Sequence, residues 1–276
     1  LDMPKLEELL KAPVAQCTGR QYPVEIIYSD YNAQDLMVIS ESTCRVITKA
    51  VDEKEGDTLV FLPGEAEIRK CEEILKKQLP NFAIHPLFGR LPHGKQAIAI
   101  IPNKEGKRKI VLATSIAETS LTIEGIKIVV DTGYSRTSRF DPKSGLSHLE
   151  TIQISKDSAD QRAGRAGRLA SGTCYRMWSI ATQERMPEHR VPEVLEADLS
   201  SMVLDIAEWG AVDIQQLTWL TAPPKGALRQ AYETLHQLDA LDQGRITPQG
   251  KMINKLPCHP RIAHMLLMAK GNNTLE

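Results

Sequence analysis

The sequence is poor in cysteine and has no long apolar run. Its five cysteines are scattered along 276 residues, without C-x-x-C pairs or nearby histidine clusters. This spacing argues against a zinc site and a disulfide framework, and it fits a reducing compartment. No apolar stretch reaches the ~18 residues that a membrane-spanning helix needs, and the first residues have no signal-peptide pattern. We therefore expect a cytoplasmic protein with no metal site of its own and no membrane partner.

The sequence also lacks an excess of either charge and the glycine-rich loops of common nucleotide-binding folds. The formal net charge is −1, so any nucleic-acid binding must come from a local arrangement of side chains. No G-x-G-x-x-G follows the first predicted strand, which argues against a Rossmann enzyme, and no G-x-x-x-x-G-K-[ST] phosphate loop is present. The length and the apolar fraction of 42% are sufficient for two domains.

The first two thirds of the chain have the pattern of an α/β domain. Continuously apolar, β-rich runs alternate with segments of helical periodicity, which predicts a parallel sheet covered by helices on both faces. In such a sheet we expect the ligand site beyond the carboxyl ends of the strands. The expected strands are residues 24–28, 58–62, 83–87, 109–113 and 126–130, with a closing strand at 172–178, and the expected helices are residues 35–49, 66–79, 94–101 and 116–122.

Residues 141–145, Asp-Pro-Lys-Ser-Gly, have turn chemistry and are flanked by alternating runs at residues 136–140 and 146–154. This pattern predicts a β-hairpin that stands off the sheet. Its Arg139 and Phe140 suit phosphate contact and base stacking, although solvated charges on a surface hairpin would give the same pattern.

From Pro192 onward the sequence predicts helices with short connections. Residues 195–209 and 225–241 are amphipathic, and the turn at Gly244 is suited to closing a small β-wing. The order helix, helix, wing predicts a winged-helix domain. Its presumed recognition helix is not basic, which favours packing over the reading of a nucleic-acid groove.

The most distinctive stretch is residues 161–168, QRAGRAGR. On a helix, Gln161, Arg165 and Arg168 would share one face. Two guanidinium groups and an amide on one face suit a polyphosphate, and a basic helix that binds any anion is the alternative.

Gly164 and Gly167 interrupt this stretch, at a cost of roughly 1 kcal/mol each relative to Ala in a helix. They remove bulk beside the arginines, so that another backbone or a ligand can come close. Arg162 points away from Gln161 on the helix and is placed to pair with a carboxylate instead.

These eight residues resemble motif VI of superfamily 2 helicases, QRxGRxGR, at every defined position. The resemblance implies that Arg165 and Arg168 are arginine fingers for the γ-phosphate of ATP. It also implies that Gln161 helps to place the attacking water.

Residues 113–123, ATSIAETSLTI, are similar to motif V of the DEAH-box helicases, which touches nucleic acid at one end and senses the nucleotide at the other. The resemblance assigns the nucleic-acid contact to Thr114 and to Ser115, where Ser replaces the usual Asn of the family. The residues implied on the nucleotide side are Ser120, Thr122 and Glu124.

Two further segments resemble parts of the same family. Residues 58–68 are similar to motif IV, and residues 85–91 look like the next family block, in which Gly89 and Arg90 approach the nucleic-acid backbone. In the family, a hairpin at the place of residues 134–155 protrudes toward the junction where strands separate, which implies a nucleic-acid contact for Arg139 and Phe140.

The whole chain therefore resembles a bacterial type of DEAH-box helicase. The implied fold is a RecA-like parallel sheet with a protruding hairpin, followed by a mostly helical winged-helix domain. The implied boundaries are a connector at residues 1–19, a second RecA-like domain at 20–190, a degenerate winged helix at 191–257 and the start of a helical ratchet domain at 258–276.

The resemblance implies ATP and Mg²⁺ that are bound mainly by a first RecA-like domain, because the phosphate loop and the Asp-Glu-Ala-His sequence are absent here. The implied partners are that domain and a single-stranded nucleic acid, with RNA favoured over DNA. We expect the C-terminal motor half of an ATP-dependent helicase, inactive in ATP hydrolysis by itself and cut from a longer protein. The alternative is a non-catalytic scaffold with a helicase-like fold.

Overall fold

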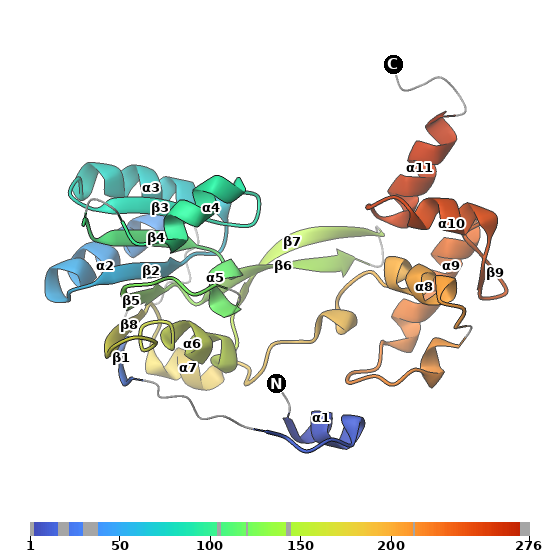
Figure 1. Cartoon of the computed structure of the whole chain (residues 1–276), viewed down its shortest axis with the longest axis horizontal. Helices are drawn as coiled ribbons and strands as arrows, with labels where there is room; N and C mark the ends of the chain where they lie inside the picture. The colour runs from blue at the N-terminus through green and yellow to red at the C-terminus, as the bar shows by residue number, and fades with distance from the viewer. Residues whose placement is uncertain are drawn as a thin grey trace. The chain divides into compact units, whose positions relative to one another are not determined.

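The computed structural model describes residues 3–15, 22–29, 38–103, 106–119, 121–141, 145–211 and 213–270 (Figure 1). Contacts divide the chain into two compact units. The first, which we call the RecA-like unit, comprises Thr18–Thr137 and Leu149–Arg190. The second, the C-terminal unit, comprises Leu1–Cys17, Ser138–His148 and Val191–Glu276.

The RecA-like unit is built on a six-stranded sheet of order β1-β8-β5-β2-β4-β3, in which each neighbouring pair is parallel. The predicted parallel sheet is thus confirmed. The last strand, however, is not a closing edge strand, because it lies between β1 and β5. The strands are β1 Val24–Tyr28, β2 Asp57–Phe61, β3 Ala83–Leu87, β4 Lys109–Ala113, β5 Ile126–Asp131 and β8 Gly172–Arg176.

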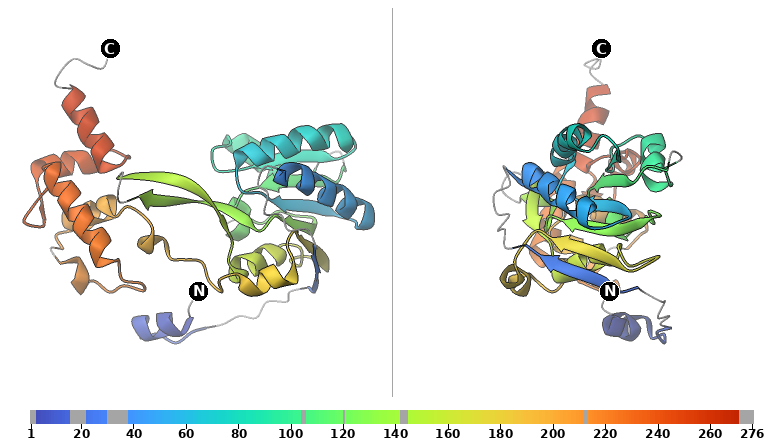
Figure 2. Two further views of the ribbon diagram at one scale, coloured as in Figure 1. Left: turned by 180° about the vertical axis from the view of Figure 1, so that it is seen from behind. Right: turned by 90° about the vertical axis from the view of Figure 1, so that its left-hand side faces the viewer.

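Helices cover both faces of this sheet (Figure 2). Successive strand residues point to opposite faces, so Val60 packs with α2 and α3 while Leu59 and Phe61 pack with α4, α5 and α6. Since both faces are buried, the strands read as continuous apolar runs, and β4 is buried at every position. The helices are α2 Ile39–Glu53, α3 Glu65–Gln78, α4 His93–Ile100, α5 Ile116–Thr119, α6 Lys156–Ala163 and α7 Ile180–Arg185.

The predicted hairpin is confirmed as strands β6 Tyr134–Asp141 and β7 Leu146–Gln153, which form a two-stranded sheet of their own. The residues of its turn, 142–144, lie outside the described part of the chain. Residues 138–148 belong to the C-terminal unit.

The rest of the C-terminal unit is mostly helical, as predicted, and its wing is the pair β9 and β10. The wing turns at Gln243 and Gly244, both with positive φ (46° and 77°). The first predicted helix, 195–209, is shorter than expected, because the helix begins only at Ser200, after a 3₁₀ segment that ends at Leu195. The elements are α1 Met3–Leu10, η1 Glu193–Leu195, α8 Ser200–Glu208, η2 Ile214–Gln216, α9 Lys225–Gln237, β9 Leu241–Asp242, β10 Arg245–Ile246, α10 Pro248–Asn254 and α11 Pro260–Lys270.

Two findings concern the whole described chain. None of its described helices is both long and apolar enough to cross a membrane. The four cysteines within the described residues are free thiols.

Candidate nucleotide and nucleic-acid sites

The arginine segment is only partly helical. Helix α6 ends at Ala163, and the chain continues in tight turns in which the amide of Arg165 bonds the carbonyl of Arg162 (3.1 Å) and that of Gly167 bonds Gly164 (3.2 Å). The expectation of a single helical face for Gln161, Arg165 and Arg168 is therefore wrong. Two glycines in four residues remove the support that an α-helix needs, and the chain turns toward β8 instead.

Gly167 lets the turning chain pass close to the segment before β1. A Cβ on this residue would lie 2.5 Å from the carbonyl oxygen of Tyr22 and 2.7 Å from Cγ2 of Val24. The amide of Tyr22 donates to the carbonyl of Gly167 (3.0 Å). Because Gly167 has no side chain, the segment that leads into β1 can pack against it. The sequence predicted close approach of either another backbone or a ligand, and here it is a backbone.

Arg162 is fully buried, with 1% of its surface exposed. Its guanidinium bonds Asp131 (2.9 Å) and Glu118 (3.1 Å) and lies over the ring of Phe61 at 4.8 Å. Burial alone would lower the pKa of Arg162, but the attraction of Asp131 and Glu118 raises that pKa overall, so the guanidinium stays charged. Burial raises the pKa of Asp131 in spite of the attraction of Arg162. The predicted pairing of Arg162 with a carboxylate is confirmed.

Arg165 also points inward, with 5% of its surface exposed. Its guanidinium donates to the backbone carbonyls of Glu118 (2.8 Å from Nε) and Leu121. No carboxylate of the described residues forms an ion pair with it. Burial, together with the nearby charge of Arg168, lowers the pKa of Arg165 to about 10, so the group stays charged at neutral pH. A fixed positive charge without a carboxylate partner is suited to an anion.

Arg168 is exposed, and its Nη1 lies 2.6 Å from Oγ1 of Thr122. Glu124, two residues further along, is exposed as well. Gln161 is exposed on the last turn of α6. Ser120 lies outside the described residues.

The position of this cluster corrects one expectation. Thr122 precedes the first residue of β5, Ile126, and Arg168 precedes the first residue of β8, Gly172. Since the strands are parallel, Arg168 and Thr122 lie toward the amino edge of the sheet, not beyond the carboxyl ends. The reason is connectivity, because both segments lead into a strand.

The four residues expected to contact the nucleic-acid backbone do gather at the carboxyl edge. Leu87 and Ala113, the last residues of β3 and β4, are paired in register, and the amide of Thr114 bonds the carbonyl of Leu87 (3.2 Å). The loops that follow these strands are therefore adjacent. Ser115, Gly89 and Arg90 are exposed, Thr114 is half-buried, and a Cβ on Gly89 would meet nothing within 4 Å.

With both clusters defined, known proteins can be compared. The family described as helicase conserved C-terminal domain matches residues 40–170, and the winged-helix part of the helicase associated domain (HA2) matches residues 231–258. The ATP-dependent RNA helicase HrpB of Escherichia coli (strain K12) is 39% identical over 275 residues, which cover 99% of this chain and 34% of that protein.

Two crystal structures of HrpB agree with this match. A structure described as the DEAH/RHA helicase HrpB of Escherichia coli superposes with a TM-score of 0.88 at 39% identity, over 97% of this chain and 34% of that one. A second, described as the DExH-box NTPase HrpB of E. coli, gives 0.84 at 39% identity over 98% and 33%. The chain belongs to the DEAH-box helicases. It spans about a third of the length of these relatives.

In this DEAH-box chain, the remaining two predicted residues belong to the other compact unit. Arg139 and Phe140 are in the part of the hairpin that belongs to the C-terminal unit. Arg139 is half-exposed and lies 3.6 Å from a carboxylate oxygen of Glu196, and Phe140 is partly buried.

Two residues that the sequence reading missed hold the arginines of the DEAH-box chain in place. Glu118 accepts Arg162 through its carboxylate and Arg165 through its carbonyl, and Asp131 neutralises Arg162. The signal for Asp131 was its place at the end of a buried strand, where an acid has no packing role. Nothing in the spacing of Glu118 pointed to Arg162.

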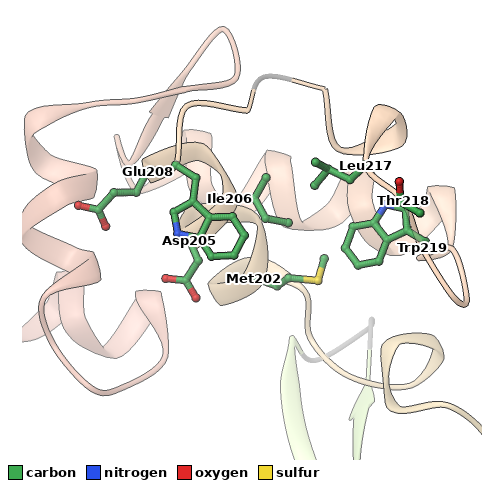
Figure 3. A pocket seen from close by; sticks show the side chains of 8 residues that line it. Met202, Asp205, Ile206, Glu208, Leu217, Thr218 and Trp219 are labelled. Atoms are coloured by element: carbon green, nitrogen blue, oxygen red, sulfur yellow. The ribbon is translucent and has the colours of Figure 1, made fainter. Parts of the chain in front are cut away.

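Two further features of the described residues bear on ligand binding. Among the described residues, no group of three or more His, Cys, Asp or Glu is placed to hold a metal ion. A pocket of about 830 Å³ on the C-terminal unit is lined by Met202, Ile206, Trp209 and Trp219 together with Asp205 and Glu208. Figure 3 shows both acids on the α8 side of this pocket, opposite Trp219. Because its charged lining is acidic, the pocket is not suited to a phosphate.

Proposed function

We propose that this chain is the C-terminal motor half of an ATP-dependent RNA helicase. Membership of the DEAH-box family supports the motor, and similarity to the E. coli ATP-dependent RNA helicase HrpB supports ATP and RNA. The observation that carries the proposal is the pair of guanidinium groups on one side of the RecA-like unit. Arg168 is exposed, and Arg165 lies behind it as a buried charge that forms no ion pair with a carboxylate of the described residues.

The arginine cluster fits a triphosphate that is held mainly by a first RecA-like domain of the longer protein, together with its Mg²⁺. ATP supplies the phosphoanhydride bond that water cleaves. Arg168 would reach the γ-phosphate oxygens, and Arg165 would add positive charge from a fixed position. Gln161 would orient the attacking water, as in other phosphoryl-transfer enzymes. Thr122, Glu124 and Ser120 would lie on the nucleotide side.

The loops at the carboxyl edge would hold a single strand of nucleic acid. Thr114 and Ser115 supply hydroxyl groups, Gly89 leaves room for close approach of a sugar-phosphate backbone, and Arg90 supplies charge. Arg139 and Phe140 of the hairpin would contact the strand from the C-terminal unit.

The test is the variant Arg168→Ala in the full-length protein. Arg165→Ala is less informative, because it also deprives two buried carbonyls of their donor, which costs stability. With Arg168→Ala we expect RNA-stimulated turnover to fall by about 10²-fold or more, since arginine fingers elsewhere contribute 10³–10⁵. The ATP affinity should change little, because the first RecA-like domain would hold most of the nucleotide. The thermal midpoint should change little, because the Arg168 side chain is exposed.

The matched control is Arg45→Ala. Arg45 is an exposed arginine on α2, which covers the opposite face of the sheet from α5 and α6. It should leave turnover unchanged. Wild-type turnover in Arg168→Ala would refute the assignment and favour the non-catalytic scaffold.

A further inference from the structure

The end of the hairpin is bonded to the linker that leads into α8. The amide of Phe140 donates to the carbonyl of Glu196 (3.0 Å), and the guanidinium of Arg139 lies 3.6 Å from the carboxylate of the same residue. One linker residue therefore holds two successive residues of β6, one through its backbone and one through its side chain.

A second bond reaches the hairpin from the first turn of α11. Nη1 of Arg261 donates to the carbonyl of Gly145 (2.9 Å), and Nη2 lies 3.4 Å from Oγ1 of Thr234 on α9. Gly145 has φ +66°, and a Cβ on it would lie 2.1 Å from Nη1 of Arg261. Gly145 thus serves two purposes: it adopts a left-handed backbone conformation, and it leaves space for the guanidinium of Arg261.

The residues that make these contacts are themselves braced. Nε2 of His259 lies 3.2 Å from Oδ1 of Asp198, which also accepts the amide of Ser200 at the start of α8 (2.7 Å). The amide of Arg261 donates to Nδ1 of His259 (3.2 Å). The linker and the start of α11 are therefore joined through one imidazole, next to the residues that contact the hairpin.

We propose that Arg261 is a positioning residue for strand separation, which keeps the end of the hairpin fixed to the C-terminal unit. An isolated two-stranded hairpin is at best marginally stable in water, so it cannot press against a base pair without outside support. Arg261 provides that support by bonding the backbone carbonyl of Gly145, independently of Arg165 and Arg168. This proposal rests on the proposed helicase function, and it assigns a role to a residue outside every motif of the sequence.

The experiment compares ATP hydrolysis with duplex unwinding in the full-length protein. Arg261→Ala should keep RNA-stimulated ATP turnover within about twofold of wild type and lower unwinding at least tenfold. Arg261→Lys should restore part of the unwinding, since an ammonium can donate one bond to the carbonyl but lacks the fork that also reaches Thr234. Gly145→Ala places a methyl group where the guanidinium of Arg261 lies, and it should therefore reproduce the Arg261→Ala result. Arg229→Ala, on α9 with 80% of its side chain exposed, is the matched control.

A second measurement does not depend on activity. Trypsin should cut after Arg139 several-fold faster in Arg261→Ala than in wild type, at equal thermal stability. Unchanged cleavage, or unchanged unwinding per ATP hydrolysed, would overturn the proposal. A wild-type protein without ATPase activity would instead refute the proposed function, and the trypsin comparison would still decide whether Arg261 supports the hairpin.

Discussion

Three arginines of one short segment occupy three different environments. Arg162 is buried and neutralised by two acids, Arg165 is buried among carbonyls, and Arg168 is exposed. A buried guanidinium tolerates little movement, because losing one partner leaves an uncompensated charge that costs about 3–5 kcal/mol. Arg162 therefore fixes the end of α6, and Arg165 is fixed in turn by α5. The backbone that leads to the exposed Arg168 is therefore held in place by two buried arginines. A fixed position is what a pre-organised charge requires in order to stabilise a transition state.

The two glycines of this segment are not equivalent, and this gives a test at the scale of single residues. Gly167→Ala should lower the free energy of unfolding by about 1–3 kcal/mol, since the new methyl group meets the carbonyl of Tyr22, which cannot move aside cheaply. Gly164→Ala should change it by less than about 1 kcal/mol, because its nearest neighbour would lie at an ordinary 3.4 Å. Urea denaturation of both variants measures the difference. Equal effects would contradict the role of Gly167 in chain packing.

The edge strand β3 carries the clearest pH dependence of a single element. Burial lowers the pKa of His85, and the charge of Lys109 lowers it further. The unfolded chain, with a pKa of about 6.5, then binds the proton more readily than the folded one. The contribution of His85 is therefore favourable above about pH 6.5 and is lost as the pH falls through the lower folded-state pKa.

We expect thermal stability to decline between pH 7 and pH 5 and the variant His85→Gln to reduce that decline. Calorimetry across this range measures both. Identical pH profiles for the wild type and the variant would show that His85 does not contribute.

Elements with a strong local signal were predictable, and the others depended on distant partners. The strands β1, β3 and β4 match their predicted bounds, because each is a short apolar run between breakers. The wing and the hairpin followed from turn residues such as Gly244 and Gly145. The end of α6 was missed, and the close packing of Gly167 on Tyr22, more than a hundred residues away, leaves no local pattern in the sequence. Lys109 was also missed: it is buried at the start of β4 and its ammonium caps α4 by bonding the carbonyls of Ala99, Ile100 and Ile101 (3.3, 3.3 and 2.8 Å).

At the scale of the whole RecA-like unit, one short segment crosses the sheet from edge to edge. Thr114 follows the last residue of β4 and Thr122 leads into β5, and both strands are parallel to β2. The candidate nucleic-acid loops and the arginine cluster therefore lie at opposite edges and are joined by α5. The resemblance to helicase motifs named residues for both sites. That the two sites lie at opposite edges of the sheet follows only from the direction of the strands in the structure. The carbonyls of Glu118 and Leu121, which accept from Arg165, lie on this connecting segment.

The same arrangement predicts what the chain can do by itself. Under the proposed function it would offer the exposed Arg168 and the buried charge of Arg165 to a triphosphate, but its sequence has no phosphate loop to hold one. Arginine fingers act on a nucleotide that another domain has positioned, so they add little when the substrate is free in solution. We expect the purified 276-residue chain to release no phosphate from ATP above background, with or without RNA, while the full-length protein does so under the same conditions. A phosphate-release assay measures both. Turnover by the isolated chain that disappears in its Arg168→Ala variant would show that the catalytic apparatus is contained in these residues.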